Sequence, residues 1–267
     1  MIIEASSRTL PAATMPDAHN LPLLALVAAV FVLAGFVKGV IGLGLPTITM
    51  GLLSVVMLPV QAAALLVVPS LVTNLWQIGG PGLAALLRRM APMLLGVCFG
   101  VAAGAGWLTG SGGGTARWAS GGLGLALIVY AALGLMHWHP RVAPAHEGWL
   151  GPLVGVATGL VTAATGVFVI PAVPYLQALG MEKEELVRAL GISFLVSTIA
   201  LALSLGQGGA LEPATLLASL IAVAPALAGM MIGQWLRLRV SAATFKKIFL
   251  VGLLLLGAYL AIRAMLA

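Results

Sequence analysis

Residues 34–47 read AGFVKGVIGLGLPT, which places one lysine, several glycines and a proline inside an otherwise unbroken apolar run. A related stretch follows 124 positions later, where residues 158–171 read TGLVTAATGVFVIP. Under this ungapped shift, Gly35 aligns with Gly159. The chain is therefore predicted to contain two repeats, each opening with a broken helix or a helical hairpin.

The composition is that of a membrane protein. Charged residues make up 7% of the 267-residue chain, against about 25% in ordinary soluble proteins, and the mean hydropathy is +1.13. Lipid must be the solvent for most of the surface, so an all-α polytopic membrane protein is predicted. An apolar helix needs about 20 residues to cross a bilayer, which leaves room for roughly eight to ten membrane segments.

Four parts of the chain are predicted: a flexible N-terminal tail over 1–20, a first membrane repeat over 21–137, an inter-repeat loop over 138–148, and a second membrane repeat over 149–267. Within the repeats, glycine, proline or charge separates successive apolar segments. These segments are predicted at 21–37, 41–57, 62–78, 90–108, 118–136, 149–165, 166–179, 186–205, 215–235 and 245–265.

Two pairs of segments are joined without a real loop: 21–37 with 41–57, and 149–165 with 166–179. Each pair is either two short crossings or a re-entrant hairpin whose tip lies within the membrane. The segment 166–179 would extend only about 21 Å as a helix, which is short for a full crossing. The hairpin is therefore the favoured interpretation.

The basic residues predict the orientation in the membrane. If Arg88 and Arg89 are cytoplasmic, alternation of the segments places most other basic residues on the same side, as the positive-inside rule requires. That side then holds Arg141, Lys183, Arg188, Arg237, Arg239, Lys246 and Lys247, and only Arg8, Arg117 and Arg263 lie outside. Equivalent loops fall on opposite sides, which predicts inverted-topology repeats with both termini outside the cytoplasm.

Several classes of function are excluded or disfavoured by composition. The net charge of +6 is scattered over short loops without interleaved aromatic residues, so no nucleic-acid partner is expected. Cys98 is the only cysteine, and the three histidines in 137–146 lie in a proline-broken loop, so no disulfide, metal or cofactor is expected. No acidic residue lies inside an apolar segment, which argues against a proton relay and against an intramembrane enzyme.

Lys38 is the only charge in the central part of an apolar segment. A buried ammonium is costly without a partner, and no carboxylate is available at its depth. The missing partner is predicted to be an anionic substrate, which Gly39, Gly42 and Gly44 would allow to approach the backbone closely. In the alternative interpretation, the first pair of segments crosses the membrane twice and Lys38 lies at the cytoplasmic surface.

Polar residues elsewhere are candidates for the same site. Asn74 and Gln77 share one helix face, and the 124-residue shift maps Thr73-Asn74 onto Ser197-Thr198. The second repeat adds Thr158, Thr162, Thr165 and Gly166, with Thr162 at the position equivalent to Lys38. Hydroxyl groups can donate to anion oxygens. The alternatives are that the threonines bond their own backbone and that the polar pairs only join helices.

The runs 35–44 (GFVKGVIGLG), 159–166 (GLVTAATG) and 169–176 (VIPAVPYL) together resemble the TauE/SafE family of sulfite exporters. The resemblance extends over nearly the whole chain from Leu21 and includes the duplicated layout. It implies an inner-membrane secondary transporter that exports small sulfur-containing anions such as sulfite, sulfoacetate or related organosulfonates.

Alternating access between the two repeats is the expected mechanism. Two other functions stay open: an anion channel, and a non-transporting membrane scaffold or assembly protein whose glycines serve helix packing. The expected partners are the lipid bilayer and a small anion, and a homo-oligomer is compatible with the sequence.

Overall fold

The computed structural model describes residues 21–80, 82–110, 113–136, 141–237, 239 and 242–266. The predicted tail over 1–20 lies outside this range, as do residues 137–140, which include the first three residues of the predicted inter-repeat loop over 138–148. Over the described residues the secondary structure is entirely helical. The helices are α1 (Leu21–Ile41), α2 (Leu45–Leu53), α3 (Pro59–Gln77), α4 (Leu83–Ala103), α5 (Gly113–Leu135), α6 (Pro144–Thr165), α7 (Ala172–Ala178), α8 (Lys183–Gln207), α9 (Pro213–Ile221), α10 (Val223–Arg237) and α11 (Ala242–Leu266).

Eight stretches in this part of the chain are long and apolar enough to cross a membrane. They are α1, α3, α4, α6, α8, most of α5 and of α11, and the stretch 213–237 that joins α9 to α10. The predicted segments 41–57 and 166–179 instead contain α2 and α7, with nine and seven residues. Such helices extend only about 10–14 Å and cannot cross a bilayer. The all-α polytopic class is thus confirmed.

The first helix is longer than the sequence predicted. It continues through Lys38 to Ile41, whereas the predicted segment ended at 37. The break comes at Gly42 and Gly44, whose φ angles of 79° and 120° are accessible mainly to glycine. Lys38 therefore lies in the last turn of α1 and not at the tip of the connection.

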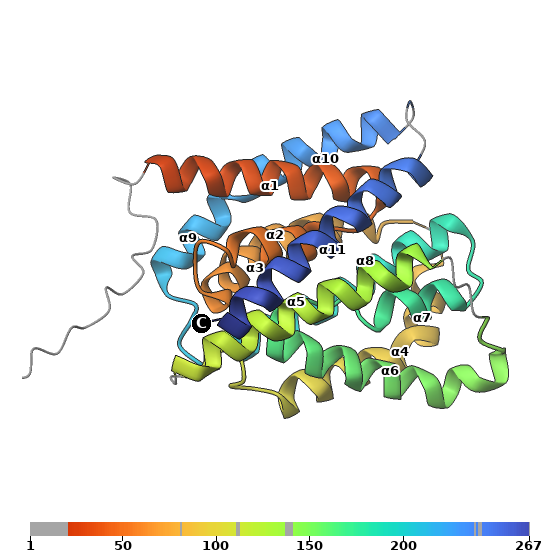
Figure 1. Ribbon diagram of the computed structural model, residues 1–267. Helices are drawn as coiled ribbons and strands as arrows, with labels where there is room; N and C mark the ends of the chain where they lie inside the picture. Colours follow the sequence, from red (N-terminus) through yellow and green to blue (C-terminus); the bar gives the residue numbers. More distant parts are fainter. Residues whose placement is uncertain are drawn as a thin grey trace, which may run out of the picture.

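Two helix pairs pack very closely and form opposite edges of the molecule: α1 with α10, and α4 with α6 (Figure 1). The central region between them contains α3 beside α8 and α5 beside α11. Glycines make both edges possible, because small residues allow helix backbones to approach one another.

The two edges repeat one contact. A Cβ atom on Gly35 would lie 2.0 Å from the carbonyl oxygen of Ala226. A Cβ atom on Gly159, which aligns with Gly35, would lie 2.3 Å from the carbonyl oxygen of Val97. Each repeat thus contributes its first crossing, α1 or α6, to one edge and its third crossing, which includes α4 or α10, to the other.

Helices α3 and α8, which are equivalent under the 124-residue shift, run antiparallel. Ser70 bonds Thr198 at 2.9 Å, while Gln77, farther along α3, donates to the carbonyl oxygen of Val187 at 3.0 Å, earlier in α8. The order of these contacts reverses along the second helix.

The last helices of the two repeats, α5 and α11, are antiparallel as well. Arg117 near the start of α5 donates to the carbonyl oxygen of Ala264 near the end of α11 at 2.7 Å. Toward the end of α5, a Cβ atom on Gly134 would lie 2.7 Å from a Leu250 methyl carbon.

Proline 69 interrupts α3 just before its polar segment. A proline has no N–H, so the Leu65 carbonyl loses its helical donor. Ser219 of α9 replaces it by donating to that carbonyl at 2.8 Å, and it also accepts from the Val68 N–H at 3.1 Å. The second repeat thereby holds α3 at its irregular turn.

We predict that Gly35→Ala and Gly159→Ala destabilise the protein to a similar degree, by about 1–3 kcal/mol each, because both force a helix pair apart. Gly252→Ala is the matched control, because a Cβ atom there meets nothing within 4 Å. Thermal unfolding in detergent measures the effect. Equal stability of Gly35→Ala and Gly252→Ala would contradict the packing described for α1 and α10.

Candidate functional site

Lys38 is buried between α1 and α3, with 4% of its surface exposed. Its ammonium group donates to Asn74 Oδ1 and, at 3.1 Å, to Thr73 Oγ1. Both acceptors are neutral oxygens, so they solvate the charge without neutralising it. Because an ammonium has three N–H groups, one donor is left for a further acceptor.

The hydrogen bonds beyond Asn74 form a chain whose direction is determined. Thr198 gives its only hydroxyl proton to the carbonyl of Phe194, at 2.6 Å, so it must accept from Ser70, at 2.9 Å. Ser70 in turn accepts from Asn74 Nδ2 at 3.1 Å, which leaves Asn74 Oδ1 to face Lys38. The chain spans α8, α3 and α1, and its acceptor end points at the lysine.

Two hydroxyl groups on α8 have no hydrogen-bond partner among the described residues although they are completely buried: Ser193 Oγ and Ser197 Oγ. They lie one helical turn apart, and Ser197 precedes Thr198 of the chain. A buried hydroxyl left unsatisfied costs about 1–3 kcal/mol, which an oxyanion acceptor would recover.

The glycines around Lys38 differ in what they do. A Cβ atom on Gly39 would lie 2.2 Å from the Met230 carbonyl oxygen, so this residue allows α10 to approach α1. Gly42 and Gly44 form the turn after α1, and the Gly42 carbonyl accepts from Gln77 Nε2 at 3.2 Å. Gln77 thus fastens the end of α3 to this turn.

The three threonines of α6 are not joined to Lys38 by hydrogen bonds among the described residues, in contrast to Thr198 of α8. Thr158, Thr162 and Thr165 each donate to the carbonyl four residues earlier in α6, at 2.7 Å. The neighbouring Gly166 ends α6 with a φ of 71° and faces Met50 of α2. These threonines therefore bond their own backbone, which was the alternative left open by the sequence. Their contact with a substrate stays a prediction.

Sequence reasoning missed Ser70 in the chain of hydrogen bonds that leads to Lys38, the bond between Thr73 and Lys38, and the unpartnered hydroxyl of Ser193 on α8. Ser70 precedes Asn74 by one turn, so its place on the same helix face was readable from the sequence. The unpartnered state of Ser193 depends on packing and carried no sequence signal.

A charged cluster lies apart from Lys38. Arg89 of α4 pairs with Glu147 of α6 at 2.7 Å and with Glu185 of α8 at 3.7 Å. In the described part of the chain, no group of three or more His, Cys, Asp or Glu side chains could hold a metal ion.

In the part of the chain that the structure describes, eight helices long and apolar enough to cross a membrane, with one buried lysine among neutral polar side chains, define a multi-pass membrane protein. A family model described as "Sulfite exporter TauE/SafE" matches residues 27–260. The chain therefore belongs to the TauE/SafE family, whose members are transporters. No curated protein and no solved structure matches the chain.

We predict that Asn74→Leu destabilises the protein by about 2–3 kcal/mol, because it deprives a buried ammonium of an acceptor. Adding Lys38→Met should recover at least about 1 kcal/mol, since no charge is then left unsolvated. Denaturant titration in detergent measures the free energy of unfolding of the native protein, both single variants and the double variant, which form a double-mutant cycle. Lys247→Met, at an exposed lysine, is the control, and its effect on the free energy of unfolding should add to that of Asn74→Leu. If both lysines showed the same coupling energy with Asn74, the hydrogen bond between Lys38 and Asn74 would be contradicted.

Proposed function

We propose that this protein is a secondary transporter that exports small sulfur-containing anions, such as sulfite, sulfoacetate or related organosulfonates, by alternating access. The observation that carries the proposal is the buried Lys38 ammonium, whose acceptors among the described residues are neutral oxygens. In a membrane transporter of the TauE/SafE family, an anion is the natural partner for that charge.

The chemistry of the cluster supports an oxyanion. A charged side chain inside the membrane costs about 2.5–3.5 kcal/mol on insertion scales, and a bound anion would offset that cost. The remaining N–H of Lys38 and the free hydroxyl of Ser197 are donors, which anion oxygens accept. Asn74, Thr198 and Gln77 act as positioning residues in this proposal, because they orient Lys38 and fasten the adjoining turn.

The arrangement of the repeats supports alternating access. Equivalent helices α3 and α8 are antiparallel, as are α5 and α11, and this is the relation expected for inverted repeats. The substrate site lies where α1 and α3 of the first repeat meet α8 of the second. A rocking movement of one repeat against the other would expose this junction to either side in turn.

Membrane electrostatics support export from a cell interior. In the proposed orientation, in the inner membrane with both termini outside, Lys38 lies nearer the cytoplasmic ends of α1 and α3. Moving one negative charge out of a negative-inside cell is favoured by about 2.3 kcal/mol per 100 mV. Export therefore needs no proton-carrying carboxylate.

We predict that inside-out vesicles take up labelled sulfite or sulfoacetate saturably, and that Lys38→Ala and Lys38→Arg each reduce uptake at least tenfold. Alanine removes the charge, whereas arginine is too large and too differently shaped for the same acceptors. Lys247→Ala is the matched control and should transport normally. Uptake that survives both Lys38 changes at equal protein levels would place the substrate site elsewhere.

The same assay separates the alternatives. A channel would give flux that does not saturate and no exchange stimulated by substrate on the far side. A scaffold would give neither flux nor stabilisation of the protein by anions.

We predict opposite sides for two equivalent loops, tested by single cysteines in a Cys98→Ala background. Gly79→Cys should react with a membrane-impermeant maleimide only in permeabilised cells, and Glu212→Cys should react in intact cells. Both positions are exposed, so burial does not limit either reaction. Labelling of both from one side would refute the inverted arrangement.

A further inference from the structure

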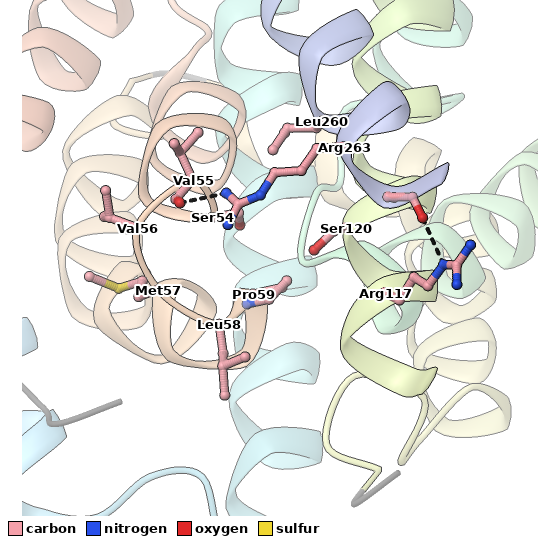
Figure 2. Close-up of a pocket in the computed structure, with 11 residues that line it drawn as sticks. Ser54, Val55, Val56, Met57, Leu58, Pro59, Arg117, Ser120, Leu260 and Arg263 are labelled. Carbon is pink, nitrogen blue, oxygen red and sulfur yellow. Dashed lines mark hydrogen bonds between the residues drawn. The ribbon is translucent and has the colours of Figure 1, made fainter. Parts of the chain in front are cut away.

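A cavity of about 350 Å³ lies between the turn that follows α2 and the neighbouring ends of α5 and α11 (Figure 2). Its lining includes two arginines, Arg117 and Arg263, together with Ser54 and Ser120. The volume is at the lower end of the range for small-molecule sites, about 300–1,000 Å³. It therefore accommodates a small anion with some water.

The two guanidinium groups give the cavity a positive charge that its own lining does not neutralise. Arg263 donates to the Val55 carbonyl at 2.7 Å, and Arg117 donates to the Ala264 and Met265 carbonyls at 2.7 and 3.3 Å. No Asp or Glu is among the described residues that line the cavity. Each guanidinium has five N–H donors, so the carbonyls hold the arginines in place and leave several donors free.

Ser54 provides an independent indication of a ligand. Its side chain is 7% exposed, and Ser54 Oγ has no hydrogen-bond partner among the residues that the structure describes. The residue lines the same cavity as the arginines. Figure 2 shows the Arg263 guanidinium beside Ser54, whereas the Arg117 guanidinium lies farther away, against the end of α11. An oxyanion has several oxygens, which can accept from hydroxyl and guanidinium donors on different sides of the cavity.

The position of the cavity relates it to the Lys38 cluster. Ser54 lies in the turn that connects α2 to α3, and Thr73 and Asn74 lie near the other end of α3. The cavity and Lys38 are thus separated by most of the length of α3, about 20 Å. In the orientation proposed above, the cavity lies at the outer side.

We propose that this cavity is a second oxyanion site, which holds the exported sulfite or sulfonate after it has left Lys38. The assignment of the exported anion rests on the proposed transport function. The phosphate of an anionic lipid headgroup presents the same chemistry, and the experiment distinguishes these two sources.

The test measures binding in the Lys38→Met background, which removes the first site. Sulfite is titrated calorimetrically into purified protein in neutral detergent and halide-free buffer. We expect saturable binding in Lys38→Met, at least tenfold weaker binding when Arg117→Gln and Arg263→Gln are added, and several-fold weaker binding with Ser54→Ala. The matched control adds Lys246→Gln and Lys247→Gln instead, which removes the same charge near the other end of α11 and should leave binding unchanged.

A second arm uses phosphatidylglycerol, with phosphatidylcholine as the zwitterionic control and lipid retention read by native mass spectrometry. Arginine-dependent binding of sulfite identifies a free anion as ligand, and arginine-dependent retention of phosphatidylglycerol alone identifies a lipid headgroup. Binding of neither by Lys38→Met overturns the site. Ser54→Ala touches none of the carbonyl contacts of the arginines, so it tests the cavity even where the arginine variants fold poorly.

The outcome is independent of the proposed function. If the native protein shows no anion flux while Lys38→Met still binds sulfite through the arginines, transport fails and the cavity stands. If flux depends on Lys38 while Lys38→Met binds nothing, the cavity fails and transport stands.

Discussion

The structure depends on how one buried positive charge is accommodated. Among the residues that the structure describes, Lys38 donates to neutral oxygens and to no carboxylate, and a line of neutral side chains, from Thr198 through Ser70 to Asn74, directs its acceptor end at the ammonium. This line crosses from the second repeat to the first, so the environment of the charge depends on contacts between the two repeats. Any ligand that adds a negative charge at this point acts on the junction between the repeats.

Glycine has two separate structural roles in this fold. At Gly35 and Gly159 the absence of a side chain lets two helix pairs meet backbone to backbone, and at Gly42 and Gly166 it permits the positive φ angles that end α1 and α6. Both kinds of position recur in the two repeats. The first kind of position brings helix backbones together at the two edges, and the second kind ends a helix beside α2 or Gln77.

The charges of the molecule are separated by environment. Arg89 pairs with glutamates, which stabilises the meeting point of α4, α6 and α8. Lys38, Arg117 and Arg263 instead bond neutral oxygens and so keep their net charge. Unneutralised cations near both ends of α3 would provide two successive binding sites for an anion. Such a path would serve a transporter of the TauE/SafE family.

The sequence by itself determined the all-α membrane class, because hydropathy along the chain shows it without any knowledge of packing. It also led to the prediction of two repeats from a fixed shift, and of a role for Lys38 from a lone charge in an apolar run. It located the second break correctly after Thr165 but placed the first break at 37, since only packing against Met230 shows that Gly39 continues the helix. It also left open whether the threonines of α6 bond their own backbone. Tertiary structure decided these points and the partners of Lys38, because they depend on contacts such as Ser70 with Thr198, 128 positions apart. Such pairings form through packing of whole helices, which no local pattern encodes.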